Sequence, residues 1–125
     1  MYLLLIPCSF SIDPITQYKR FTIFRDIARH GVYFSHETST YASPTASCAW
    51  NELSALRSVF KEDLQFLLIC NTKGFTGHPM GVSFEDVVAA EVLVSGCVPP
   101  VANMPEVDPF LGSDIKLSRG GEISL

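Results

Sequence analysis

Residues 65–94 constrain the fold of this chain more than any other stretch. The run QFLLIC at 65–70 is short and almost wholly apolar, which is typical of a strand covered on both faces. A polar loop with three glycines follows it, and the polar side chains of this loop are Asn71, Thr72, Lys73, Thr76 and His78. We expect a helix from Ser83 onward, because its hydroxyl can cap the first turn. The stretch therefore predicts a strand, a loop and a helix.

Polar loops that follow the carboxyl ends of strands are where open α/β sheets usually bind ligands. Lys73 and His78 stand in such a loop, so the sequence predicts a functional site there.

The other elements follow from periodicity and from residues that start or stop them. We expect a strand at 2–7, a helix from Asp13-Pro14 to Gly31, a strand at 32–34, a helix at 49–60 and a short strand near 115–117. In the helix at 49–60, Trp50, Leu53, Leu56 and Phe60 form the apolar face, while Glu52, Arg57 and Lys61 are expected to face outward. The tail from residue 98 contains four prolines and is expected to be mostly extended loop. Strands that alternate with helices favour an α/β fold.

Composition limits the class of function. With 125 residues, 47% of them hydrophobic and 18% charged, the chain is at most one globular domain. A net charge of -4 argues against a nucleic-acid partner, and no stretch is long and apolar enough to span a membrane. The four cysteines, Cys8, Cys48, Cys70 and Cys97, form no CxxC pair, so we expect no structural zinc and reduced thiols in a cytoplasmic protein.

Two histidine motifs resemble those of the β-ketoacyl synthases, the condensing enzymes of fatty-acid and polyketide synthesis. NTKGFTGHPMG at 71–81 is similar to the family's second histidine motif, in which a lysine precedes a Gly-His pair at the spacing of Lys73 and His78. HETST at 36–40 is similar to the first motif, His-Gly-Thr-Gly-Thr. Val98-Pro99-Pro100 and residues 117–121 also resemble family features in the same order. The resemblance covers 30–121, which leaves 1–29 as a segment outside it and 122–125 as a tail.

The resemblance implies part of a thiolase-like fold, the C-terminal half, with a mixed sheet flanked by helices. It implies that His36 and His78 serve the decarboxylation of a malonyl thioester, which leaves an enolate oxygen that imidazole donors can stabilise. It also implies that Lys73 holds the local geometry and that Thr38, Thr40 and Thr76 bind a phosphopantetheine arm. No cofactor or metal is expected. The implied partners are an acyl carrier protein or acyl-CoA, with the missing N-terminal synthase half or a second copy of the chain.

The residues leave simpler roles open. A histidine at a strand end is more often a structural hydrogen-bonding group than a catalyst, a loop lysine can be merely solvated, and threonines often bond to nearby backbone. His30 matches no motif. We expect it at the carboxyl end of its helix, where the helix dipole favours a histidine. In the family that the chain resembles, an acidic residue is common in the helix after the second histidine. Glu85 and Asp86 come slightly earlier here, and their simpler role is pairing with the helix dipole in the first turn.

Three features depart from the family pattern. Glu37 replaces the usual glycine beside His36, and none of the four cysteines has the surroundings of the family nucleophile. The final Gly-Phe-Gly-Gly segment is also missing. Covalent acyl transfer needs the nucleophile, so we expect a synthase fragment that carries only the histidine half of the site. The alternatives are a non-catalytic module that binds an acyl carrier or a partner synthase chain, and a decarboxylase of malonyl thioesters.

Overall fold

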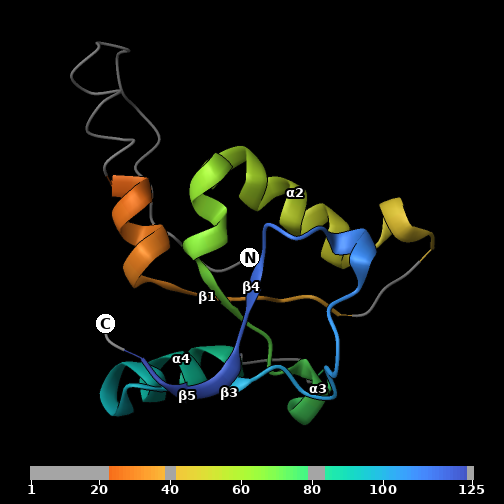
Figure 1. The fold of residues 1–125 in the computed structure, drawn as a ribbon. Helices are drawn as coiled ribbons and strands as arrows, with labels where there is room; N and C mark the ends of the chain where they lie inside the picture. Colours follow the sequence, from red (N-terminus) through yellow and green to blue (C-terminus); the bar gives the residue numbers. More distant parts are fainter. Residues whose placement is uncertain (1–22, 39–41, 79–83, 124–125) are drawn as a thin grey trace.

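The computed structural model describes residues 23–38, 42–78 and 84–123 (Figure 1). Its central element is a parallel sheet of three strands: β1 (Val32–Phe34), β2 (Leu68–Cys70) and β4 (Lys116–Leu117), in the order β1-β2-β4. Val32 lies opposite Leu68, and Leu68 lies opposite Lys116. A second sheet pairs β3 (Cys97–Pro100) with β5 (Arg119–Glu122) in antiparallel fashion. The α/β class expected from the sequence is therefore confirmed; the finer thiolase-like assignment stays a prediction.

Helices flank the parallel sheet on both sides (Figure 1). Residues 23–30 are helical, and α2 (Cys48–Phe60) continues into a 3-10 helix, η2 (Lys61–Phe66). Ser47 caps α2 by accepting a hydrogen bond from the Trp50 amide at 3.0 Å. A short helix, α3 (Lys73–Thr76), and a longer one, α4 (Phe84–Ser95), follow β2 in the chain. Two further 3-10 turns are η1 (Pro44–Ala46) and η3 (Pro109–Leu111).

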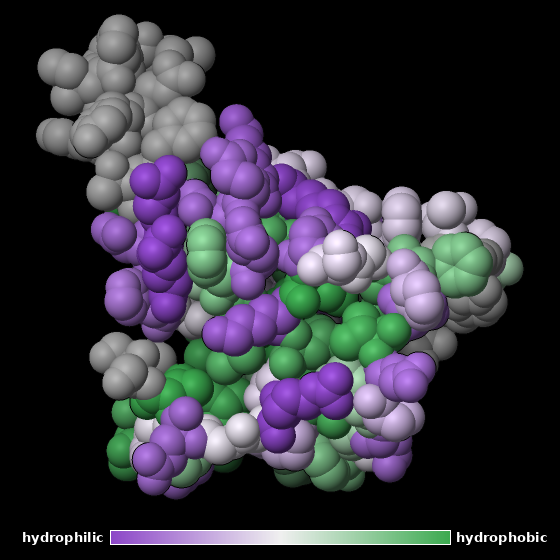
Figure 2. All heavy atoms as spheres, viewed as in Figure 1, coloured by the Kyte–Doolittle hydropathy of each residue, from purple (hydrophilic) through white to green (hydrophobic). Residues whose placement is uncertain are grey.

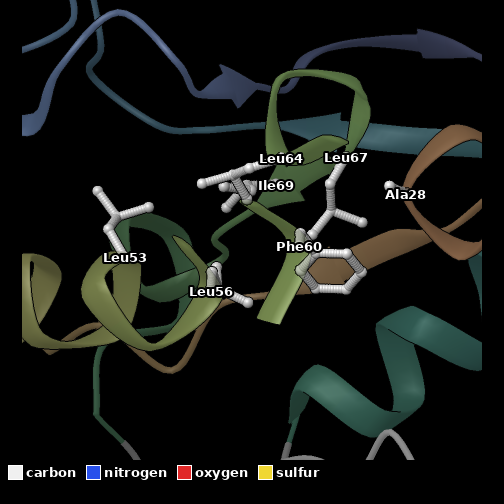
Figure 3. Close-up of a cluster of buried hydrophobic side chains, with 7 residues drawn as sticks. All are labelled: Ala28, Leu53, Leu56, Phe60, Leu64, Leu67 and Ile69. Atoms are coloured by element: carbon white, nitrogen blue, oxygen red, sulfur yellow. The ribbon is translucent and has the colours of Figure 1, made fainter. Parts of the chain in front are cut away.

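The main hydrophobic core lies between the sheet and α2 (Figure 3). Its buried members come from helix 23–30, from α2 and from the stretch 64–69 that contains the end of η2 and the start of β2, and they are Ala28, Leu53, Leu56, Phe60, Leu64, Leu67 and Ile69. The expected apolar face of α2 is thus confirmed for three of its four residues, Leu53, Leu56 and Phe60. Each fully buried side chain of this kind contributes about 1.5–3 kcal/mol through removal from water.

A second, smaller core covers the opposite face of the sheet. Cys70, Val92 and Val98 are its buried residues, and Val32, Phe34, Leu68, Val88 and Ile123 pack against them. Because alternate strand residues point to opposite faces, Leu68 and Cys70 face α4 while Ile69 faces α2. Both faces of β2 are therefore covered, as its apolar sequence predicts.

Some expected boundaries are corrected by the structure. Gln65 and Phe66 belong to η2 and are exposed, so the strand begins at Leu68 rather than at residue 65. Residues 97–100 form a strand where loop was expected, because β5 supplies an edge partner that the two prolines tolerate. The strand expected at 2–7, the first half of the helix expected from residue 13 and the Ser83 cap lie outside the described residues.

Candidate active site at the carboxyl ends of β1 and β2

The loops that carry the two histidine motifs leave adjacent strands at the same edge of the sheet. β1 ends at Phe34 and β2 ends at Cys70, and these two residues are paired in register. The Ser35 amide donates to the Cys70 carbonyl at 2.8 Å, which fixes the start of the first loop against the end of the second. Parallel pairing therefore brings His36 and Lys73 to one region, although they are far apart in the sequence.

A single carboxylate joins His36 and Lys73. Glu85, in the first turn of α4, forms an ion pair with the Lys73 ammonium group through its Oε1 atom. The same oxygen lies 3.7 Å from Nδ1 of His36. The Lys73 and Glu85 side chains are only 7% and 4% exposed, whereas that of His36 is half exposed. The site thus has a buried charged pair beneath an imidazole that solvent can reach.

The charges at this site determine the protonation state of Glu85. Burial raises the pKa of the Glu85 carboxyl, but its hydrogen bond with Lys73 and the positive charges of Lys73 and His36 lower it. The net effect is a pKa below the ordinary value. Glu85 is therefore an anion at neutral pH.

Asn71 ties the two loops together beneath this pair. Its Nδ2 donates to the Glu37 carbonyl at 3.2 Å and to the Ser35 hydroxyl at 3.3 Å. Its Oδ1 accepts from the Lys73 amide at 2.9 Å. The side chain therefore fixes the backbone on both sides of His36 relative to the start of α3. Glu37, which stands where the family has glycine, is half-buried within this arrangement.

Glu52 in α2 supports the first loop from the other side. Its carboxylate accepts hydrogen bonds from the Tyr33 hydroxyl at 3.0 Å, the Ser35 hydroxyl at 2.5 Å and the His36 amide at 3.0 Å. The expectation that Glu52 faces outward into solvent is wrong, because it turns toward the carboxyl end of β1. Burial, together with the charge and hydrogen bond of Glu52, raises the pKa of Tyr33 well above its usual range.

Sequence reasoning missed the roles of both Glu52 and Glu85, yet each has a signal in the helical spacing. Glu85 lies on the stripe that Val88 and Val92 continue, and Glu52 lies on the stripe of Leu56 and Phe60. A carboxylate on the apolar stripe of a helix must find a buried partner, because an isolated buried charge is costly. Arg57, also expected outward, is instead half-buried and bonded to Asp114 at 2.5–2.7 Å.

The other predicted site residues lie around this centre. His78 is exposed, two residues after α3, and within the described residues no hydrogen bond or ion pair links it to His36. Thr76 is half-buried and donates to the Thr72 carbonyl at 3.2 Å, a structural bond of its own helix. Thr38 is half-buried. Thr40 lies outside the described residues. The roles of all four stay predictions.

A pocket of about 310 Å³ opens beside the site, between α2, the sheet and residues 101–111. Ser35, Glu52 and Asn71 contribute to its wall, and Leu53 and Leu117 to its apolar side. Its volume is at the lower end of the range for small-ligand sites. Cys48, the cysteine closest in sequence to the first motif, is half-buried at the start of α2 and is a free thiol.

Comparison with protein-family models, with curated proteins and with solved structures gave no match for this chain. In the described part of the chain, no group of three His, Cys, Asp or Glu side chains is arranged to hold a metal ion. Nor does any helix there have the length and apolar character needed to cross a membrane.

Proposed function

We propose that this chain supplies the histidine half of a β-ketoacyl synthase site, which in the intact enzyme condenses acyl and malonyl thioesters with loss of carbon dioxide. The observation that carries the proposal is the meeting of His36 and Lys73 at the buried Glu85 carboxylate. The two residues come from separate motifs with a family resemblance, and they meet at the edge of the sheet where α/β proteins bind ligands.

The geometry suits stabilisation of an enolate. Nδ1 of His36 faces Glu85, and the half-exposed imidazole ring is accessible to a ligand from solvent. A proton on Nε2 can be donated to a thioester oxygen as carbon dioxide leaves and negative charge develops there. Lys73 holds Glu85, and Glu85 orients the imidazole. By resemblance, His78 supplies the second imidazole, and Thr38, Thr40 and Thr76 contact the pantetheine arm.

The surface of α4 supports a larger assembly. This helix is apolar on nearly all sides, yet only Glu85 and Val92 are buried. Its exposed residues include Val87 at 63%, Leu93 at 73% and Val94 at 85%. Hydrophobic residues also extend across the middle of the face shown in Figure 2. A helix that is hydrophobic all round is normally buried, so we propose that the cysteine-bearing half of the synthase packs here.

The test is incubation with malonyl- and acyl-carrier protein, with and without a separately produced synthase half that bears the cysteine. We expect ketoacyl product only when both halves are present, and its loss in His36→Ala. The matched control is His30→Ala, since His30 is an exposed histidine at the opposite end of the sheet. Carbon dioxide release by the chain alone, without condensation, would favour the decarboxylase, and binding without turnover in either mixture would favour the non-catalytic module.

A further inference from the structure

A second pocket, of about 260 Å³, lies at the amino ends of β1 and β2, opposite the His36 site. It collects basic side chains from two distant parts of the sequence. Arg29 and His30 come from the end of helix 23–30, and Lys116 comes from β4. Its described lining contains no Asp or Glu, although the whole chain has a net charge of -4. The described lining of the pocket is therefore basic, although the protein as a whole is acidic.

The register of the sheet places Lys116 in this pocket. Val32, Leu68 and Lys116 are paired across the three strands and so project from the same face of the sheet. Val32 and Leu68 pack against the second core and also line the pocket. Lys116 is exposed and stands on β4, at the edge of the sheet. The three paired residues thus place two apolar side chains, Val32 and Leu68, next to the ammonium group of Lys116 at the edge of the sheet.

Arg29 is held by an aromatic side chain. Its guanidinium carbon lies 4.4 Å from the centroid of the Phe66 ring, a cation–π contact, and Phe66 also lines the pocket. Stacking uses the face of the guanidinium group and leaves the N–H groups in its plane free for hydrogen bonds. The pocket therefore has an oriented donor group on one side and an ammonium group on the other.

The helix dipole explains only part of this cluster. Basic residues are favourable at a helix carboxyl end, which accounts for Arg29 and His30. It does not account for Lys116, which belongs to another element, or for the hollow that these side chains line. The dipole adds roughly half a negative charge at this end, and the two permanent cations, Arg29 and Lys116, more than offset it.

We propose that this pocket binds a small phosphorylated molecule with an apolar body. The phosphoryl group would lie between Arg29 and Lys116, because arginine matches phosphate oxygens with paired N–H donors and lysine supplies a compact positive charge. The apolar body would rest on Val32, Leu68 and Phe66. This site is independent of the proposed condensing function and lies at the other end of the sheet.

The experiment is a titration of the ¹⁵N-labelled chain with phenyl phosphate, followed by amide NMR. We expect saturable shifts at residues 29–32, 68 and 116, and binding about tenfold weaker in Lys116→Gln, as for loss of one charge-assisted contact. Arg29→Gln should weaken binding similarly, and Lys61→Gln, an exposed lysine outside the pocket, should bind as the parent chain does. Lys116 is on an edge strand and exposed, so its substitution leaves both cores intact.

Three outcomes would overturn the proposal. The first is the absence of saturable binding, and the second is binding that Lys116→Gln leaves unchanged. The third is binding of phenol as tight as that of phenyl phosphate, which would show that the phosphoryl group is not recognised.

Discussion

Lys73 and Glu85 form a buried ion pair that connects the first residue of α3 to the first turn of α4. Both side chains are more than nine-tenths buried, so each charge depends on the other for compensation. The pair also fixes the position of the carboxylate that faces His36. It therefore links the stability of the fold to the geometry of the candidate site.

The first prediction concerns this pair. Lys73→Met should lower the free energy of unfolding by about 3–5 kcal/mol, because it leaves the Glu85 charge buried without a partner. The double variant Lys73→Met/Glu85→Leu should recover much of that loss. Urea unfolding of the three proteins measures the effect.

A surface pair provides the control for that experiment. Arg25 and Asp63 are 3.4 Å apart, and the Arg25 side chain is 57% exposed. Arg25→Ala should therefore cost no more than about 1 kcal/mol. Equal losses from Lys73→Met and Arg25→Ala would show that the Lys73–Glu85 pair is not buried as described.

The second prediction concerns the stability of the protein at low pH. The pKa of Glu85 is lowered in the folded protein, so the folded state favours the ionised form. This contribution is present above the unfolded pKa, about 4.5, and is lost as the pH falls through the lower folded value. Stability measured from pH 6 to pH 3 should decline less steeply in Glu85→Gln. If stability declined equally steeply with falling pH in the parent chain and in Glu85→Gln, the lowered pKa of Glu85 would be contradicted.

The third prediction concerns the stability of the protein at high pH. Burial raises the pKa of the Cys70 thiol from 9.0 to about 11. The unfolded chain therefore loses this proton first, and the free energy of unfolding should fall between pH 9 and pH 11, by about 2–3 kcal/mol. Cys70→Ala should make this decline less steep and leave the part above pH 10 that comes from Tyr33, whose pKa is also raised. Cys48→Ala should keep the full decline. The measurement is denaturant unfolding at several alkaline pH values, and a decline between pH 9 and pH 10 as steep in Cys70→Ala as in the parent chain would exclude Cys70 as its source.

The fourth prediction concerns Glu52. Glu52→Ala removes the acceptor for Tyr33, Ser35 and the His36 amide, and buried donors left unpaired cost about 1–3 kcal/mol each. We expect lower stability and large shifts of the His36 amide signal by NMR. Glu91→Ala, at an exposed position of α4, is the control and should leave that signal unchanged. An unshifted His36 amide in Glu52→Ala would contradict the described support.

The parts of the fold that the sequence could predict are those with a strong repeating pattern. The apolar run before Asn71 and the spacing of Leu53, Leu56 and Phe60 predict β2 and α2 to within a few residues. The pairing of β3 with β5 could not be predicted, because strands of four residues that contain proline or glycine have little pattern of their own.

The site was predictable only in part. The parallel arrangement of β1 and β2 brings the loops of His36 and Lys73 together, and that follows from the strand–loop–helix order. Glu85 is different, because an acidic residue in a first helical turn already has an adequate local explanation. Only the ion pair seen in the structure shows that its partner is Lys73.

The most direct test of the central claim is binding of a malonyl thioester of pantetheine to the chain, followed by NMR of the His36 ring and the Lys73 side chain. We expect saturable shifts at both groups and their loss in His36→Gln and in Lys73→Met, while His30→Gln should bind as the parent chain does. Absence of binding, or shifts confined to residues away from His36, Lys73 and Glu85, would contradict the claim that these residues form a condensing site.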